Sequence, residues 1–252
     1  MCNIFFDGRT LLPYNQHHMK QKIRFCRSTD GVRIAYATMG SGPPIVWVAN
    51  WLTHLNLDLE NPFFSHWFQA LSRDNTLIRF DARGNGLSDR DVDHLSVDAW
   101  RSDLEAVVAD LGLERFPLFG FCQGGATAIA YAHHHPGKVS QLVLYDSYPR
   151  GAYTPGPSLK MKQQAQALED MIRVGWGKEA PAFREVFVSL LSPEASKERQ
   201  RWLSEMQRET TSPHMAARLW RAFHEVDVTS IAQEVDVPAL VFHVKGDEMV
   251  PF

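Results

Sequence analysis

The residues best suited to chemistry stand in the stretch 118–126, where an apolar run leads into Gly-Phe-Cys-Gln-Gly-Gly. Cys122 lies between Gly120 and Gly124, and a sharp strand-to-helix turn requires such small neighbours. Because this turn exposes its central side chain, we predict that Cys122 is a nucleophile. The turn also aims the Gln123 N–H at a developing oxyanion and places the sulfur at a helix N-terminus, which favours the thiolate. The alternative is a small buried cysteine at an ordinary strand-helix junction.

A second motif makes this pattern more specific. Residues 81–89 read Asp-Ala-Arg-Gly-Asn-Gly-Leu-Ser-Asp. Together with the cysteine turn, this D-x-R-G-x-G-x-S segment resembles the α/β-hydrolase fold family, and segments 175–177 and 212–219 are similar to its bacterial members with a helical cap. In that family serine is usual where this chain has cysteine. The 81–89 segment is structural there, because its glycines permit tight turns while its arginine and aspartate hold the loop.

The resemblance implies roles for residues far from the cysteine. A loop after an early strand supplies the second oxyanion N–H in the family, and Trp51 follows the apolar run 45–49, so we expect its backbone to be that donor. The alternative for Trp51 is packing under the cap, and both can hold. The family's acid follows a later strand, which makes Asp247 the candidate. Its alternative is an Asx-turn residue after a glycine.

The implied fold class is α/β, with a mostly parallel central sheet, helices on both faces and a helical cap. Hydrophobic patterning agrees, since short apolar or alternating runs predict strands. They lie at 23–27, 32–39, 45–49, 76–80, 116–119, 139–145 and 238–244. The first two flank an Asp-Gly hairpin signal. Helices are predicted around 62–72, after the Ser96 cap, and after the cysteine turn.

Strand patterns disappear between 147 and 230, where helical periodicity predicts helices over 161–174, 182–191, 198–208 and 213–225. We therefore expect a flexible extension over 1–20, core over 21–146, a cap over 147–230 and further core over 231–252. Methionines and aromatics of the cap should form its own core, and some should line an apolar pocket. They are Met161, Met171, Trp176, Phe183, Phe187, Trp202, Met206, Met215, Trp220 and Phe223.

The composition and net charge of the chain limit the kinds of molecule that it is expected to bind. Of 252 residues 44% are hydrophobic and 22% charged, which is typical of a globular protein. Lys and Arg number 26 against 29 Asp and Glu, so no strong net charge favours nucleic acid or an anionic membrane. Three widely spaced cysteines favour a reducing compartment, and we expect a cytoplasmic protein without a signal peptide or membrane span.

Several histidines suggest a metal, but their spacing argues against one. His17 and His18 are adjacent without further ligands in sequence, and we interpret them as part of a solvated tail. The run 133–135 falls in the last turn of a predicted helix, where consecutive side chains point in different directions. We expect neither a metal nor a cofactor.

The general-base histidine of the family follows the acid, after one further strand and before a closing helix. This chain ends at Phe252, before such a segment, and we expect a truncated form. His54 and His224 are candidates for a substitute base, whereas His243 is expected within a strand. A strand at 238–244 without its usual neighbour would leave an exposed sheet edge, so we also expect self-association.

Two functions from different classes follow. The first is hydrolysis of a small apolar carboxylic ester or thioester by Cys122, impaired where the histidine is missing. The second is a ligand-binding or regulatory module that keeps the pocket and has lost turnover.

Overall fold

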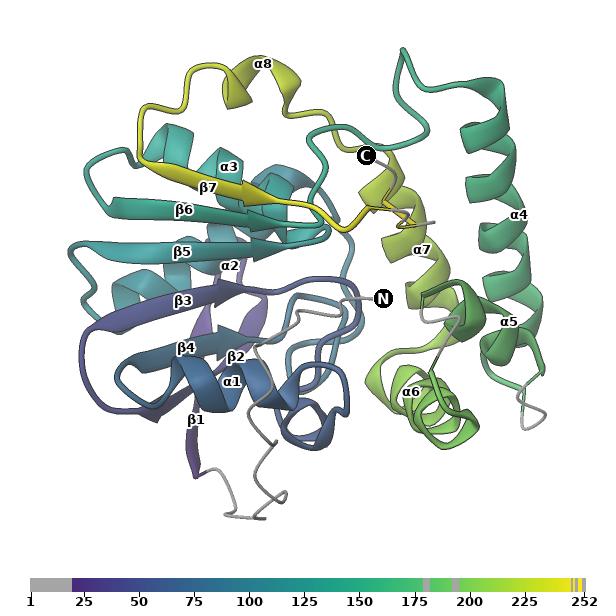
Figure 1. Ribbon diagram of the computed structural model, residues 1–252, viewed down its shortest axis with the longest axis horizontal. Coiled ribbons are helices and arrows are strands. Elements are labelled where there is room, and N and C mark those ends of the chain that lie inside the picture. Colours follow the sequence, from purple (N-terminus) through teal and green to yellow (C-terminus); the bar gives the residue numbers. More distant parts are fainter. Residues whose placement is uncertain (1–19, 179–181, 192–194, 246, 248, 251–252) are drawn as a thin grey trace.

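The computed structural model describes residues 20–178, 182–191, 195–245, 247, 249 and 250. Almost all of the extension expected over 1–20 lies outside them. The described strands form one seven-stranded sheet in the order β1-β2-β4-β3-β5-β6-β7 (Figure 1). They are β1 (Gln21–Arg27), β2 (Arg33–Gly40), β3 (Pro44–Val48), β4 (Thr76–Phe80), β5 (Phe116–Phe121), β6 (Val139–Tyr145) and β7 (Ala239–Phe242).

The sheet begins with the hairpin that the Asp-Gly signal predicts. β1 and β2 pair in antiparallel fashion, and Gly31 between them has a φ of 88°, which glycine adopts without strain. β2 pairs antiparallel with β4, and every later pairing, from β4 through β3, β5 and β6 to β7, is parallel. The mostly parallel sheet is therefore confirmed. The carboxyl ends of its parallel strands meet at one edge.

Helices cover both faces of the sheet, as expected. α1 (Ser65–Leu71) lies on one face, and α2 (Val97–Asp110) and α3 (Gly124–His134) lie on the other (Figure 1). Consecutive residues of β5 serve the two faces, because side chains alternate along a strand. Leu118 belongs to the same buried cluster as Leu104 of α2, whereas Phe119 stacks on Trp47 with ring centroids 4.4 Å apart.

In the described part of the cap, four helices lie beyond the carboxyl edge of the sheet, where Figure 1 shows them opposite the strand arrowheads. They are α4 (Leu159–Gly175), α5 (Ala182–Leu191), α6 (Lys197–Thr210) and α7 (Pro213–His224). The side-chain hydroxyls of Ser158, Ser196 and Ser212 accept backbone N–H groups at the starts of α4, α6 and α7. These caps fix where the helices begin.

The 81–89 segment is structural, as the resemblance implies. The side chain of Arg83 is fully buried, and its Nη2 lies 2.6 Å from Oδ1 of the equally buried Asp103 on α2. A second ion pair of 2.6 Å joins Arg83 to Asp30 in the β1–β2 turn. Asp81 accepts the N–H groups of Leu55 and Leu87. These contacts tie the turn after β4 to the first helix behind the sheet and to the hairpin.

One strand end and two short helices differ from expectation in a way that matters for the site or the topology. β7 ends at Phe242, so His243, expected within the strand, lies just beyond it. Two short helices, η1 (Leu57–Glu60) and α8 (Thr229–Ala232), were not anticipated, because four residues carry too little periodicity to detect.

None of the helices in the described ranges has the length and apolar content needed to cross a membrane.

Candidate active site

The turn between β5 and α3 has the geometry of a nucleophile elbow. Cys122 has a φ of 51°, a left-handed conformation that costs energy for a residue with a side chain. Its N–H donates to Tyr145 O at 3.0 Å on the neighbouring strand, and its carbonyl accepts the Gly125 N–H at 3.1 Å. These bonds hold the strained residue in place. The turn therefore presents the thiol at the carboxyl edge of the sheet.

Close packing explains the small residues on either side of the cysteine. A Cβ on Gly120 would lie 2.8 Å from Gly125 Cα, and a Cβ on Gly124 would lie 2.8 Å from Ala49 O. Both distances are shorter than real Cβ contacts allow. The requirement for small residues, inferred from sequence, is confirmed.

Both expected oxyanion donors have partners within the chain. The Gln123 N–H lies near enough to the Cys122 sulfur to lower the pKa of the thiol. The Trp51 N–H donates to the side-chain Oε1 of Gln123 at 3.1 Å. The structure thus places the Trp51 loop next to the residue that follows Cys122, with the Gln123 side chain bound to the Trp51 N–H. The oxyanion role of the two N–H groups remains a prediction.

The Trp51 side chain packs under the cap, as the alternative interpretation predicts. Its ring is surrounded by Trp176, Phe187, Trp220 and Phe223, with centroid distances of 6.0, 5.8, 5.6 and 6.1 Å. Only 8% of the residue is exposed. The indole Nε1 is buried and has no hydrogen-bond partner among the described residues. This cluster fixes the loop that carries the Trp51 N–H.

The expectation of a thiolate at the elbow is wrong. Burial raises the pKa of Cys122 to about 12. The Gln123 N–H opposes this shift, but the carboxylates of Asp247 and Asp146 add to it, because a second negative charge beside them is unfavourable. Desolvation and two nearby carboxylates therefore outweigh the helix N-terminus, and the resting sulfur is a neutral thiol at physiological pH.

Asp247 lies after β7 and is close enough to Cys122 to influence its ionisation. Its Oδ1 accepts the N–H groups of Met249 at 2.7 Å and Val250 at 2.9 Å, so it also forms the Asx turn of the alternative interpretation. The carboxylate is thereby fixed at the carboxyl edge of the sheet. Its role as triad acid remains a prediction.

Two residues near the cysteine escaped the sequence analysis. Asp146 directly follows β6, has a φ of 43° and accepts the Val244 N–H at 2.6 Å. The rule that selected Asp247, a carboxylate just past a strand, would also have selected Asp146. Tyr148 hydrogen-bonds to the Gln123 side chain, and its pKa is raised by burial and by Cys122. No motif marks it.

The candidate substitute bases are bound elsewhere. The His54 Nδ1 accepts the Leu57 N–H at 3.4 Å, and the pKa of His54 is lowered by burial. The His224 Nδ1 lies 2.8 Å from Trp220 O, and burial lowers its pKa too. The His243 Nε2 meets Val250 O at 2.5 Å. None of these contacts orients an imidazole toward Cys122.

The histidine run of α3 diverges, as its position in a helix predicts. His134 Nδ1 lies 2.8 Å from Ala130 O, whereas His135 Nε2 lies 2.7 Å from a Glu105 carboxylate oxygen. His133 instead approaches Glu234 at 3.6 Å. Within the described residues, no three His, Cys, Asp or Glu side chains gather in a way that could hold a metal ion. His17 and His18 lie outside these residues.

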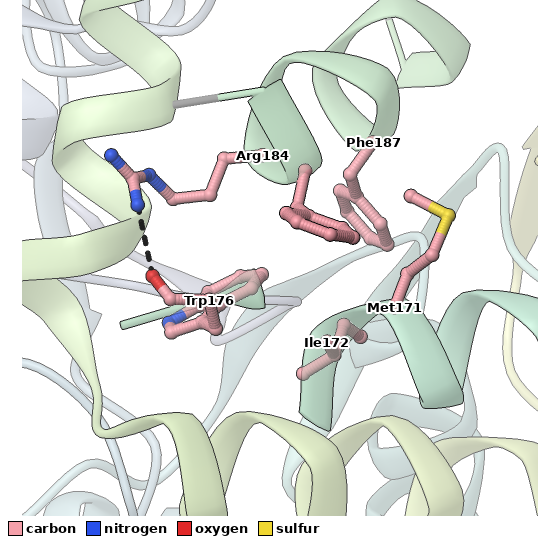
Figure 2. Close-up of a pocket in the computed structure, with 6 residues that line it drawn as sticks. Met171, Ile172, Trp176, Arg184 and Phe187 are labelled. Atoms are coloured by element: carbon pink, nitrogen blue, oxygen red, sulfur yellow. Dashed lines mark hydrogen bonds between the residues drawn. The ribbon is translucent and has the colours of Figure 1, made fainter. Parts of the chain in front are cut away.

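The cap contains a small apolar cavity, shown in Figure 2. Its volume is about 10 Å³, and its lining residues are Met171, Ile172, Trp176, Phe183, Arg184 and Phe187. Arg184 closes one side by donating to Trp176 O at 3.0 Å. Such a volume holds about one water molecule, so the interior of the cap is closely packed.

A mostly parallel sheet that presents a nucleophile elbow at its carboxyl edge, beneath a helical cap, defines the class of α/β-hydrolase-fold proteins. The family model described as alpha/beta hydrolase fold matches residues 51–251, and the chain belongs to this family. The match includes the elbow, the cap and the segment after β7.

Individual relatives agree with this assignment. The AB hydrolase superfamily protein YisY of Bacillus subtilis is 26% identical over 230 residues, covering 90% of this chain and 83% of the relative. A non-heme haloperoxidase of Rhodococcus erythropolis is 27% identical over 241 residues, with 90% and 83% covered. Among solved structures, an esterase from Exiguobacterium antarcticum superposes with a TM-score of 0.78 at 25% identity, covering 90% of this chain and 83% of its own.

Proposed function

We propose that this protein transfers acyl groups from small carboxylic esters or thioesters to Cys122, and that it is a hydrolase of such compounds. The observation that carries the proposal is the left-handed Cys122 on the elbow, held by the bonds of its N–H and carbonyl to Tyr145 and Gly125. A strained residue between a strand and a helix persists only where its surroundings hold it, and such strain is typical of nucleophiles.

In the proposed acylation, the Cys122 sulfur attacks the acyl carbon and an S–C bond forms. The bond from that carbon to the leaving oxygen or sulfur breaks, and its electron pair stays with the leaving group. The thiol proton passes to solvent, and the leaving group takes a proton from solvent and departs as an alcohol or thiol. The N–H groups of Gln123 and Trp51 would hold the oxyanion that forms in between. Asp247 would orient a base in the complete family arrangement.

The relatives support this reaction class. The matched proteins include an esterase and a protein of the hydrolase superfamily, and the esterase superposes over nine-tenths of this chain. The haloperoxidase matches an equal share of this chain but is named for a different activity. We therefore base the choice of acyl transfer on the thiol at the elbow.

The test is acylation by p-nitrophenyl acetate at about pH 9, followed by intact-mass spectrometry. A few per cent of an ordinary thiol ionises near neutral pH, and higher pH compensates in part for the raised pKa of Cys122. We expect one acetyl group on Cys122 and none at that position in Cys122→Ala. Labelling that is unaffected by Cys122→Ala would refute the assignment of the nucleophile.

Turnover of the 252-residue chain should be slow after the first acylation. Water must lose a proton to attack the thioester, and His54, His224 and His243 all make other contacts. Loss of a triad base costs on the order of a millionfold in turnover. Sustained release of p-nitrophenol beyond one equivalent would show that a base acts on Cys122.

The second candidate, a ligand-binding module without turnover, is favoured by a specific observation. The Trp51 N–H is already bound to the Gln123 side chain, and the thiol is neutral, so the resting site is poorly prepared for attack. An apolar acid or ester that stabilises the protein against heat, without acylating Cys122 at any pH, would favour this function over catalysis.

We also infer a cytoplasmic location, since Cys26 and Cys122 are both unpaired. We infer a small apolar substrate rather than nucleic acid or a membrane. Fractionation of cells that express the full chain tests the location.

A further inference from the structure

A side-chain oxygen occupies the Trp51 N–H, which is the donor that the proposed function gives to a reacting carbonyl. The Oε1 of Gln123 accepts the Trp51 N–H at 3.1 Å, and this oxygen belongs to a planar carboxamide. The carboxamide also hydrogen-bonds to the Tyr148 hydroxyl. Gln123 is 8% exposed. Its side chain is thus held by partners on two loops, next to the nucleophile.

We propose that the Gln123 carboxamide closes the oxyanion hole of the resting enzyme and must leave the Trp51 N–H before an acyl group can be attacked. This inference rests on the proposed acyl-transfer function. In it, Gln123 has two roles: its backbone N–H stays a donor, and its side chain is a gate that a substrate carbonyl displaces.

The moving part must be the glutamine side chain. The Trp51 loop cannot withdraw easily, because four cap aromatics surround its ring. The Gln123 backbone is fixed as well, since it follows Cys122, whose N–H and carbonyl are both hydrogen-bonded. The side chain needs only rotations about its own single bonds. Opening therefore requires loss of the bonds to Trp51 and Tyr148 and no change of fold.

The gate should slow acylation of the thiol by esters but not its alkylation. An ester must place its carbonyl oxygen on the Trp51 N–H, and so competes with the Gln123 oxygen. An alkylating reagent such as iodoacetamide needs no oxyanion donor at the carbon that sulfur attacks. The ratio of acylation rate to alkylation rate at Cys122 therefore reports on the gate, and changes in thiol ionisation cancel from it.

The experiment measures both rates by intact-mass spectrometry for the wild type, Gln123→Met, Gln123→Glu and Tyr148→Phe. Gln123→Met preserves the side-chain length and removes the acceptor, so the ratio should rise about 3- to 10-fold, the value of one ordinary hydrogen bond. Gln123→Glu offers a charged acceptor, which binds the N–H more strongly, and should lower the ratio. Tyr148→Phe removes one of the two partners of the carboxamide and should raise the ratio less than Gln123→Met does.

Gln207→Met is the matched control, because Gln207 is a buried glutamine of α6 whose side chain has no hydrogen-bond partner. Its ratio should stay within about twofold of the wild type. An equal rise in Gln207→Met, or an unchanged or lower ratio in Gln123→Met, would overturn the gate.

A second measurement separates the gate from the proposed function. Hydrogen exchange of the Trp51 amide, followed by NMR, should be faster in Gln123→Met than in the wild type, since its acceptor is gone. If neither the wild type nor any variant is acylated although iodoacetamide labels Cys122, the acyl-transfer function is refuted. The exchange rate of the Trp51 amide then decides alone whether the Gln123 side chain covers the Trp51 N–H. Unchanged exchange then overturns the inference, and faster exchange supports it.

Discussion

The sulfur of Cys122 is subject to opposing electrostatic influences. The helix N-terminus and the Gln123 N–H stabilise its anion, while burial and the carboxylates of Asp146 and Asp247 oppose ionisation. Burial has the largest effect, so the thiol form prevails. A cation beside the sulfur, such as a protonated imidazole, would shift this balance toward the thiolate.

The first prediction concerns the pH dependence of labelling. Below its pKa, the thiolate fraction of a cysteine rises about tenfold per pH unit. An ordinary thiol levels off above about pH 9, but Cys122, with a pKa raised to about 12, should react faster at each step up to about pH 10. Peptide mapping after iodoacetamide treatment, with free cysteine as reference, measures this. A plateau near pH 8 would contradict the raised pKa.

The second prediction concerns the carboxylates. Asp146→Asn keeps an Oδ1 for the Val244 N–H but removes a charge that opposes ionisation of Cys122. Alkylation of Cys122 should therefore accelerate about 3- to 10-fold at pH 8, which corresponds to at most about one pKa unit. Asp236→Asn removes the same charge from an exposed position and serves as the control. Equal rates in the two variants would show that the Asp146 charge is not felt at the sulfur.

Among the elements, β3, the elbow and α3 depend on one close approach. A Cβ on Gly124 would lie 2.8 Å from Ala49 O and 2.9 Å from Val48 O, both backbone atoms that cannot rotate away. Gly124→Ala should therefore push α3 from the end of β3 and destabilise the protein by about 1–3 kcal/mol. Urea unfolding measures the loss. Gly137→Ala, where nothing lies within 4 Å, should cost little, and similar losses in both would refute the argument.

Most elements could be predicted because their signals are local. Ser96 and Ser212 occur as N-caps where sequence places them, and Gly112, just past the end of α2, has the positive φ typical of a glycine there. β4 and β6 have the predicted bounds, since each is a short, mainly apolar segment bounded by polar residues. β7 is shorter than its apolar run, because pairing with β6, rather than hydrophobicity, sets its ends.

The site was less predictable, because its decisive contacts join distant residues. The elbow is encoded by neighbours and could be found, and so could Asp247 by its place after a strand. The bond from Trp51 to Gln123 spans 72 positions and depends on the cap that fixes Trp51. The raised pKa of Cys122 likewise depends on burial and on Asp146, which no local pattern connects to the cysteine.

In the whole molecule, cap and core are joined near the nucleophile. Trp51 of the core lies among aromatics of α5, α7 and the end of α4, and Thr211 after α6 donates to Gly84 O at 2.6 Å. Access to Cys122 therefore depends on the packing of the cap as well as on the elbow.

The strand β7 forms one lateral edge of the described sheet, next to β6. β7 is the final strand in the described sheet, and Leu240 and Val241 are 59% and 65% exposed. Their side chains point to opposite faces, so both faces of this edge are uncovered. An exposed, apolar edge strand pairs readily with another chain. We therefore expect the protein to self-associate through β7 at micromolar concentrations, which size-exclusion chromatography with light scattering can measure.

Val241→Lys tests whether β7 is the contact. A charge on an edge strand opposes pairing, and about 1.4 kcal/mol of lost affinity would move half-association to a roughly tenfold higher concentration. Val186→Lys adds the same charge at a valine of α5 that is 48% exposed, and should leave association unchanged. A stable monomer at all micromolar concentrations would contradict self-association. If Val241→Lys and Val186→Lys raised the concentration of half-association equally, the added net charge alone would explain the change. The contact would then not lie at β7.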